Sequence, residues 1–446
     1  MALTGLEIYK LLPQTNCKEC SYPTCLAFAM KLAAKQAELK ACPYVTEEAK
    51  TKLEAASAPP MRLIEIGSAD QRLQVGNETV LFRHEKTFYH RPGLFWRLRD
   101  SEKPEDLKKK AAEADAYQVD YVGINLTLDG FAVEAASGDA KTFAAAVAVV
   151  HAASQKPLIL IAPTPELAKA GLEAAGDSRP LLHAATADNW QAMAEIAKAA
   201  KVPLVARAAD LDSLAALTDN LAKAGLEDIV LDPAITGYKD SLEQLTIARR
   251  LALRKNFRPL GFPVITFPGA TGADETLLAA EHIAKYAGFI VLDTFDPASF
   301  YPLLVLRQNI YTDPQKPIQV QPGVYEINNP NADSPLMVTT NFSITYFAVA
   351  NEVEGSGWPA WLVVADAEGM SVLTAWAAGK FDAERIAKSI KGFGLEQKVS
   401  HKKLLIPGAV AVLSGELEEE LPGWQILVGP REAVDISGYL KATWKN

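Results

Sequence analysis

The feature that most constrains the fold is a series of alternating segments between residues 61 and 320. Short runs of β-branched and other apolar residues are separated by Ala-rich stretches with helical periodicity. Near-continuous apolar strands that alternate with helices indicate parallel strands covered on their outer face. Eight such units in about 250 residues match a TIM (β/α)8 barrel, with an open doubly wound sheet as the alternative. The eight expected strands are residues 79–85, 121–126, 157–162, 181–185, 203–208, 228–232, 262–267 and 289–293.

The remainder of the chain divides into two further α/β or helical parts. Residues 61–67 are expected to form a hairpin strand that closes one end of the barrel, and ASAPP (56–60) is typical of a linker. Residues 312–335 are rich in Pro, Asn and Asp, which indicates a connection with short extended pieces. We therefore predict domains at residues 1–57, 61–320 and 325–446, the last with a Rossmann-like α/β fold. Its expected strands are residues 336–340, 361–366, 402–408 and 424–429.

All four cysteines lie near one end of the 446-residue chain. Cys17, Cys20, Cys25 and Cys42 have the spacing C-x2-C-x4-C-x16-C. Thr24 is expected to cap a helix that begins at Cys25 and carries the chain away from the first three cysteines. The chain can return to Cys42 if residues 35–41 are extended, because an extended residue covers about twice the distance of a helical one.

Three interpretations of this cysteine pattern remain open. A [4Fe–4S] cluster needs four thiolates and nothing else. A structural zinc site typically uses two C-x2-C pairs, whereas this chain has one. Unliganded buried cysteines would not gather at one terminus while the large cores contain none. The spacing favours the cluster over zinc, and zinc over unliganded thiols.

The composition and charge exclude several classes of partner. The chain is 49% hydrophobic and 22% charged, which is ordinary for a soluble globular protein. A net charge of −9 and a pI near 5.4 argue against binding nucleic acid or an anionic membrane. The N-terminal residues lack the pattern of a signal peptide, and the most apolar stretch, residues 142–153, is too short to span a bilayer. We expect a cytoplasmic protein, in which clustered cysteines are metal ligands rather than disulfides.

Small polar loops follow each expected strand of the C-terminal part. Ligands of parallel sheets bind beyond the carboxyl ends of the strands. There is no G-x-G-x-x-G and no P-loop motif, so nucleotide binding has no support. Each loop by itself is also compatible with an ordinary turn. The candidate ligand-binding residues at these ends are Thr339, Thr340, Asn341, the segment 367–371, Pro407, Gly408, Gly429, Pro430 and Arg431.

Together these features resemble the large subunits of corrinoid iron–sulfur proteins of the acetyl-CoA decarbonylase/synthase (Wood–Ljungdahl) system. The resemblance covers essentially the full length, and its most specific motif is the cysteine spacing. The tail TTNFSITYF…DAEGMSVLTAW…GPREAVDISGY is similar to the corrinoid-binding domain of that family. The resemblance implies a [4Fe–4S] cluster on the four cysteines and a corrinoid on the tail. The implied corrinoid-binding residues are Thr339, Thr340, Asn341, Thr345, Tyr346, Gly369, Met370, Ser371, Val372, Leu373, Thr374, Pro407, Gly408, Gly429, Pro430, Arg431, Asp435 and Ile436.

The same resemblance implies a function and a set of partners. The cobalt would carry a methyl group from methyltetrahydrofolate, by way of a separate methyltransferase, to acetyl-CoA synthase. A second, smaller barrel subunit would complete a heterodimer. The cluster would return stray Co(II) to Co(I), supplied with electrons by a ferredoxin or a reductive activator. Two alternatives are an autonomous folate- or corrinoid-dependent methyltransferase and an iron–sulfur electron-transfer adaptor.

The chain offers no protein ligand of the usual kind for cobalt. Many corrinoid methyltransferases supply a histidine from a D-x-H-x-x-G motif, and none of the six histidines here has an Asp two residues before it. Only His401 lies in the tail. We predict a base-off corrinoid with no histidine below the metal, and Thr374 can approach the lower face without coordinating it.

The expected barrel also carries polar residues at strand ends. These are Asn125, Asp129, Asp232, Asp293 and Asp296, and the segments 231–237 and 291–297 loosely resemble pterin-binding methyltransferase barrels. Asp and Asn at such junctions are more often helix caps or turn formers. A folate site in this barrel is the alternative to that structural role. The family resemblance implies that folate binds another protein and that this barrel acts as a scaffold and docking surface.

Overall fold

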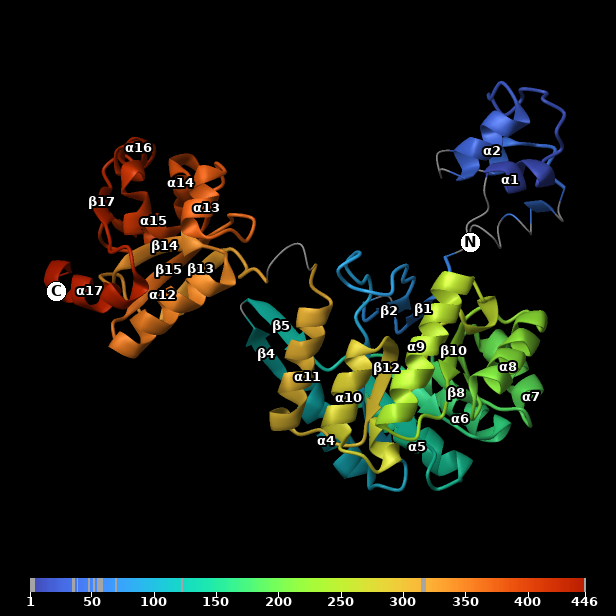
Figure 1. Cartoon of the computed structure of the whole chain (residues 1–446). Helices are drawn as coiled ribbons and strands as arrows, with labels where there is room; N and C mark the ends of the chain where they lie inside the picture. Colours follow the sequence, from blue (N-terminus) through green and yellow to red (C-terminus); the bar gives the residue numbers. More distant parts are fainter. Residues whose placement is uncertain are drawn as a thin grey trace. The chain divides into compact units, whose positions relative to one another are not determined.

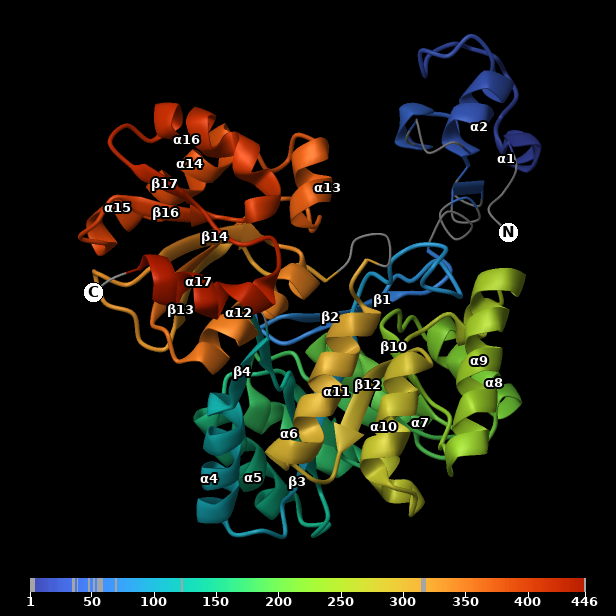
Figure 2. The same cartoon turned by 60° about the vertical axis from the view of Figure 1, so that its left-hand side comes forward.

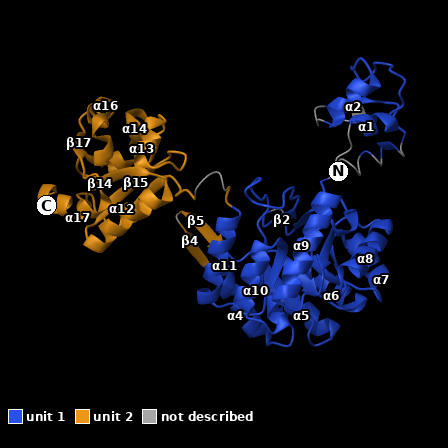
Figure 3. Cartoon of the chain, in the orientation of Figure 1, with its two compact units in different colours: residues 1–117, 127–311 blue, residues 118–126, 312–446 orange. Residues whose placement is uncertain are grey.

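The structure is a computed structural model that describes residues 5–33, 37, 39–46, 49–50, 53, 59–68, 70–121, 123–313 and 318–444 (Figure 1). Its internal contacts divide it into two compact units, residues 1–117 with 127–311 and residues 118–126 with 312–446 (Figure 3). Residues 118–126 thus belong to the second unit although they lie inside the range predicted for the barrel. Most of the expected linker, residues 56–58, lies outside the described residues. The three-domain division stays a prediction.

The first unit contains a closed barrel of eight parallel strands, which confirms the predicted fold class. Around the barrel the order is β3-β6-β7-β8-β9-β10-β11-β12, with β12 pairing again with β3. The strands are β3 (Gly93–Arg99), β6 (Gly130–Glu134), β7 (Leu158–Ile161), β8 (Leu181–Ala185), β9 (Leu204–Arg207), β10 (Ile229–Asp232), β11 (Val264–Thr266) and β12 (Ala287–Leu292). The helices between and after them are α4 (Pro104–Ala116), α5 (Ala140–Ala153), α6 (Pro165–Ala175), α7 (Trp190–Ala200), α8 (Leu211–Lys223), α9 (Tyr238–Lys255), α10 (Glu275–Ala284) and α11 (Pro297–Ile310).

Two of the eight predicted barrel strands were wrong. Residues 79–85 form a loop in which Phe82 is exposed. Residues 121–126 overlap two short strands, β4 (Gln118–Tyr121) and β5 (Ile124–Thr127), which form a separate two-stranded sheet. The true strands β3 and β6 were missed because arginines and a terminal glutamate interrupt their apolar runs.

A two-stranded hairpin closes the amino-terminal end of the barrel, as predicted for residues 61–67. β1 (Leu63–Ile66) pairs antiparallel with β2 (Leu73–Gly76). Ile64, Ile66 and Val75 are buried in the same core as the inward-facing residues of the barrel strands. Gly76 has φ +104°, and a β-carbon there would lie 2.0 Å from the Arg62 carbonyl oxygen, so only glycine fits this turn. The carboxyl end of the barrel is left open.

The second unit is built on a five-stranded sheet with the order β13-β15-β14-β16-β17. β14 (Leu336–Thr340), β15 (Ala360–Ala365), β16 (Lys403–Ile406) and β17 (Gln425–Val428) are parallel, and all four lie where the sequence predicted them. β13 (Gly323–Ile327) pairs antiparallel with β15 and lies in the segment expected to hold extended pieces.

Helices cover both faces of this sheet. On one face lie α13 (Val372–Ala377), α14 (Ala383–Gly392), α15 (Leu395–Lys398) and α16 (Ser414–Glu420), and on the other lie α12 (Ser343–Ser356) and α17 (Ile436–Thr443) (Figure 2). Alternate strand residues enter separate cores, with Leu336 and Val338 facing one helix layer and Met337 facing the other. In the part of the chain that the structure describes, five short 3-10 segments complete the loops. η1 (Leu39–Ala41), η2 (Arg258–Leu260) and η3 (Pro268–Thr271) lie in the first unit, and η4 (Gly408–Leu413) and η5 (Ala433–Asp435) lie in the second. Among the described residues, no helix is long and apolar enough to cross a membrane.

His282 on α10 couples the stability of the first unit to pH. Its side chain is fully buried, and neither ring nitrogen has a partner among the described residues. Burial lowers the pKa of His282 to about 4, whereas an unfolded histidine titrates near 6.5. Below pH ~6.5 the unfolded chain therefore binds more protons than the folded one, and the stability of the fold falls as the pH drops toward 4.

We expect the free energy of unfolding to lose roughly 3 kcal/mol between pH 7 and pH 4 through His282 alone. His282→Leu should remove this part of the pH dependence, and His84→Leu, at an exposed loop position, should retain it. Urea unfolding followed by circular dichroism at both pH values measures the effect. Equal pH dependence in the His282→Leu variant and the parent chain would contradict the assignment.

Candidate functional site

The four cysteines lie on a small helical and looped segment. α1 (Gly5–Leu11) packs against α2 (Cys25–Ala33), and Cys42 follows the short 3-10 turn η1 (Leu39–Ala41). As predicted, α2 begins at Cys25, and the Thr24 hydroxyl accepts a hydrogen bond from Ala27 N at 3.0 Å. The expected extended return before Cys42 was wrong for residues 39–41, because they are helical; residues 35, 36 and 38 lie outside the described residues.

The loop before α2 winds through several left-handed residues. Gln14, Asn16, Lys18 and Ser21 have φ between 49° and 69°. The Asn16 side chain accepts a hydrogen bond from Cys25 N at 2.8 Å, and Asn16 N lies 3.4 Å from Cys25 Sγ. Backbone N–H groups beside left-handed residues can form an anion-binding concavity, as at many iron–sulfur sites.

The cysteine side chains share one apolar core. Cys20, Cys25 and Cys42 are buried together with Ile8, Leu12, Phe28 and Leu53, whereas Cys17 is exposed. Burial raises the pKa of the Cys42 thiol, and the nearby thiolates of the other three cysteines raise it further, against a backbone hydrogen bond at Tyr44. Within the described part of the chain, no three His, Cys, Asp or Glu side chains converge on a single ion. A cubane cluster holds its four thiolates farther apart than one ion does.

A cavity of about 280 Å³ opens at the carboxyl edge of the second unit's sheet. The chain passes from β14 to β15 on one side and then to β16 on the other side of β14, so the strand order switches between β14 and β16. The two strands share a single registered pair, Met337 with Leu405, and then diverge. A switch point of this kind leaves a crevice between the loops, which is where ligands of parallel sheets bind.

The structure brings about half of the predicted corrinoid-binding residues to this cavity. Thr339 lines it, and its buried hydroxyl has no hydrogen-bond partner among the described residues. The predicted residues that line the cavity are Thr339, Thr345, Val372, Pro407, Gly429, Pro430, Arg431 and Ile436. Those that do not line it are Thr340, Asn341, Tyr346, Gly369, Met370, Ser371, Leu373, Thr374, Gly408 and Asp435.

Some of the residues outside the cavity support its walls. Asn341 is buried, and its side-chain oxygen accepts hydrogen bonds from Ala367 N and Gly369 N, both at 2.9 Å. Its side-chain nitrogen donates to Gln319 and Asp366. Asn341 therefore fixes the turn after β15 to the end of β14. Tyr346 instead packs against Tyr325, with ring centroids 4.9 Å apart.

Each connection at this edge has one large apolar side chain that is more than half exposed. Ile344 follows β14, Leu373 follows β15, Val412 follows β16 and Val434 follows β17, and they are 55–68% exposed. Val434 lies on η5 (Ala433–Asp435). Because the carboxyl ends of parallel strands meet at one edge, these four residues, called the apolar rim below, lie at the same edge as the cavity, and Ile344 also lines it. Exposed apolar side chains gathered at one edge mark a surface that a ligand or a partner covers.

The histidine of this unit lies at the opposite edge. His401 precedes β16, its Nε2 lies 2.9 Å from the Ser334 carbonyl oxygen, and its Nδ1 accepts from Lys403 N at 3.2 Å. Its ring packs against Trp444. The other five histidines lie in the first unit. Within the second unit, no histidine reaches the cavity among the described residues.

Of the five polar residues predicted at the barrel ends, only some lie at the carboxyl end of the barrel. Asn125 lies on β5, outside the barrel. Asp129 precedes β6 and accepts from Leu94 N at the amino end. Asp296 caps α11 by accepting from Ser299 N at 3.0 Å, the structural role weighed as an alternative. Asp232 and Asp293 do lie at the barrel mouth, at and just after the carboxyl ends of β10 and β12.

Comparison with known proteins places this architecture in a family. A family model described as CO dehydrogenase/acetyl-CoA synthase delta subunit matches residues 63–440, and a model described by its Fe-S cluster matches residues 12–44. The chain is 44% identical over 443 residues to the corrinoid/iron-sulfur protein large subunit of Moorella thermoacetica, with 99% of both chains covered. The chain belongs to the family of corrinoid/iron-sulfur protein large subunits. The acetyl-CoA decarbonylase/synthase complex subunit gamma of Archaeoglobus fulgidus is 37% identical, with 98% of both chains covered.

The solved structures that this chain is similar to include dihydropteroate synthases. That from Xanthomonas albilineans covers 57% of this chain and 100% of its own, with a TM-score of 0.39 and 14% identity. A TM-score this low supports no conclusion about this chain.

Sequence reasoning missed most of the apolar wall of the cavity. Met337, Val338, Leu405 and Ile406 come from the strands themselves. Ile344 and Ala348 come from the first turns of α12, and their i, i+4 spacing behind a strand end is the signal that could have identified them. The other wall residues carry no such signal, because apolar residues within strands also form the ordinary core.

Gly408 gives a direct test of how the cavity is built. A β-carbon at this position would lie 2.3 Å from the Gly429 carbonyl oxygen and 2.8 Å from the Pro430 carbonyl carbon. Backbone atoms cannot rotate away, so Gly408→Ala should push the loops after β16 and β17 apart. We expect a loss of about 1–3 kcal/mol in the free energy of unfolding.

Gly415→Ala is the matched control for this prediction. It lies a few residues farther along, within α16, and a β-carbon there would meet nothing within 4 Å. It should be neutral or stabilise the protein by about 0.5–1 kcal/mol. Equal unfolding free energies for the two variants in denaturant titration would show that the close loop contact is not required.

Proposed function

We propose that this chain is the large subunit of a methyl carrier with two metal centres. Cys17, Cys20, Cys25 and Cys42 hold a [4Fe–4S] cluster, and the carboxyl edge of the C-terminal sheet holds a base-off corrinoid. A separate methyltransferase supplies the methyl group from methyltetrahydrofolate, and acetyl-CoA synthase receives it. The division into a cluster module (1–57), a barrel (61–320) and a corrinoid domain (325–446) serves this function.

The observation that carries the proposal is the 44% identity to a corrinoid/iron-sulfur protein large subunit over 99% of both chains. The match includes the cysteine loop, the barrel and the C-terminal unit together. A protein that shared only an electron-transfer module or only a barrel would match over a part of the chain.

The cysteine segment fits an iron–sulfur cluster by its own structure. Three of its four cysteines are buried in an apolar core, which lowers the dielectric around the sulfurs. Asn16 N lies 3.4 Å from Cys25 Sγ, and other backbone N–H groups of this left-handed loop would donate to cluster sulfur in the same way. Cys17 is exposed, so the cluster would lie close to the surface, where a ferredoxin or a reductive activator can reach it.

The C-terminal edge fits the underside of a large, flat, amide-bearing ligand. The orphaned Thr339 hydroxyl would find a partner in a ligand amide, and the Gly429–Arg431 loop allows close backbone approach. A cavity of about 280 Å³ is smaller than a whole corrinoid, so it would receive only part of one. The exposed apolar rim would lie beneath the remainder of the ring.

The two cofactors would supply the chemistry that the chain itself lacks. A bound corrinoid provides cobalt that accepts and releases a methyl group, and the cluster provides an electron that returns the cobalt to its accepting state. The chain supplies position and access. Its rim side chains remain more than half exposed, so they leave an apolar surface that the smaller subunit would cover.

If the four cysteines hold the cluster, its loss should abolish the reductive reactivation of the cobalt and leave the methyl transfer itself intact. Cys20→Ser should lower the iron and sulfide contents below the four of each expected for the reconstituted parent chain. With the small subunit and the methyltransferase present, methyl transfer should start normally from chemically reduced protein. It should then decline and fail to recover, because the cobalt can no longer be reduced. Thr24→Ser, which keeps the hydroxyl cap of α2, is the control.

Iron and sulfide analysis with a methyl-transfer assay decides between the alternatives. If the analysis finds one zinc per chain and no labile sulfide, the cysteines hold a structural zinc ion and not an iron–sulfur cluster. Methyl transfer without an added methyltransferase would favour an autonomous enzyme.

The position of His401 predicts the electronic environment of the cobalt. With both ring nitrogens engaged at the amino edge of the sheet, His401 cannot reach a ligand at the carboxyl edge. The EPR spectrum of the Co(II) form should therefore lack nitrogen superhyperfine splitting, and His401→Ala should leave it unchanged. Nitrogen splitting in the parent protein would contradict the base-off assignment.

A further inference from the structure

The open end of the barrel contains a cavity that the methyl-carrier function does not use. Its volume is about 520 Å³, within the range of small-molecule sites. The hairpin β1–β2 closes the opposite end of the barrel. Polar side chains from the carboxyl ends of six strands line the cavity, namely Arg97, Glu134, His183, Arg207, Asp232 and Thr266.

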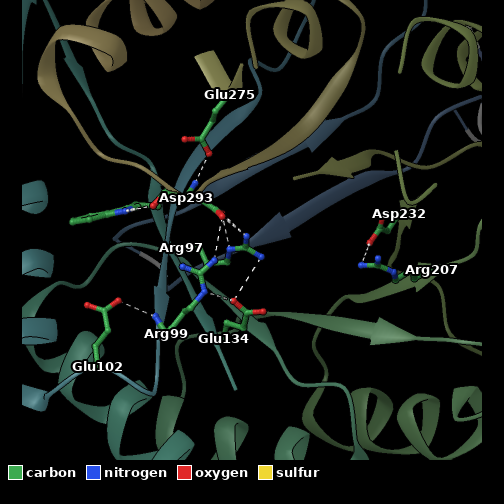
Figure 4. A network of polar contacts seen from close by, with 9 residues as sticks. Arg97, Arg99, Glu102, Glu134, Arg207, Asp232, Glu275 and Asp293 are labelled. Atoms are coloured by element: carbon green, nitrogen blue, oxygen red, sulfur yellow. Dashed lines mark hydrogen bonds and ion pairs between the residues drawn. The ribbon is translucent and has the colours of Figure 1, made fainter. Parts of the chain in front are cut away.

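One side of the cavity is a network of oppositely charged side chains. Arg97 Nε donates to Asp293 Oδ1 at 2.7 Å, and Arg97 Nη1 lies 3.6 Å from Glu134 Oε2. Arg99 pairs with the same two carboxylates, each at 3.1 Å (Figure 4). Each guanidinium thus faces two carboxylates. These charges offset one another, so this side of the cavity presents little net positive charge to an anion.

Arg207 has a different environment. Its side chain is 45% exposed, and its Nη1 donates to Asp232 Oδ2 at 3.1 Å. Asp232 is its only partner among the described residues. In Figure 4 this pair lies apart from the network around Asp293. A guanidinium has five N–H donors, so most of those of Arg207 remain available to the cavity.

Asp232 holds this arginine in a fixed position. It is buried, and it also accepts from His183 Nε2 at 2.8 Å and from Ala234 N at 2.9 Å. Burial by itself would raise the pKa of Asp232, but the hydrogen bond and charge of His183 and the charge of Arg207 keep it below its usual value. The carboxylate therefore stays ionised and orients both side chains. His183 retains a second ring nitrogen, Nδ1, without a described partner.

We propose that the barrel mouth binds a small organic oxyanion through the free donor edge of Arg207. A guanidinium edge matches a carboxylate or phosphate group in bidentate geometry. Phe267 lies beside the pair, with its ring centroid 5.0 Å from that of His183, and Ile161 and Ile235 also line the cavity. The oxyanion would thus carry a compact apolar or unsaturated part.

Calorimetric titration of the full chain tests this site, with malonate as the carboxylate probe and inorganic phosphate as the phosphate probe. We expect saturable binding of at least one probe to a single site, and the tighter probe identifies the ligand class. Arg207→Gln should weaken that binding at least tenfold. Arg62→Gln is the control, because Arg62 is also half-exposed and paired with carboxylates but does not line the cavity.

A second variant keeps the test decisive if Arg207→Gln fails to fold. Ala270 is exposed and lines the cavity, so Ala270→Phe should fill the space while leaving every charge in place. It too should weaken binding at least tenfold. The proposal is overturned if neither probe saturates at millimolar concentrations. It is also overturned if the folded Arg207→Gln or Ala270→Phe variant binds as tightly as the parent chain.

Discussion

Parallel pairing of strands is the constraint on which both units depend. It places every carboxyl end, and therefore every βα connection, at one edge of the sheet. In the second unit this brings together Ile344, Leu373, Val412 and Val434 from connections spread over 90 residues. In the barrel it brings Arg207 and Asp232 to one mouth. Short parallel strands joined by helical crossovers thus bring residues that are distant in the sequence together at one surface.

The two units use this constraint in different ways. The barrel strands close on themselves, and the hairpin fills one end, so space remains only at the other end. The five-stranded sheet stays open, and its space arises where β14 and β16 diverge after the Met337–Leu405 pair. The first arrangement gives a polar cavity with internally paired charges. The second gives a smaller cavity with a largely apolar wall and exposed apolar side chains at the same edge.

Much of the fold followed from the pattern of apolar runs, and the exceptions have physical causes. β3 was missed because Arg97 and Arg99 interrupt its apolar run, and these arginines are tolerated because they lie at the barrel mouth against Asp293 and Glu134. Residues 121–126 read as a buried strand because they are apolar. Tyr121 and residues 124–126 belong instead to the short strands β4 and β5 of the second unit, where Tyr121 packs against the cluster of Val320 and Val364.

The sequence by itself determined the α/β class and the four parallel strands of the C-terminal sheet, and its cysteine spacing predicts the metal-ligand set. These depend on spacing and on local periodicity, which a linear pattern carries. Only the tertiary structure decided which loop residues face a cavity and which, like Asn341, brace its walls from behind. It alone also showed that Arg207 has one carboxylate partner, Asp232, whereas Arg97 lies against two carboxylates. Both distinctions depend on where strands diverge and on which charges meet across the barrel, and those are properties of pairings between distant segments.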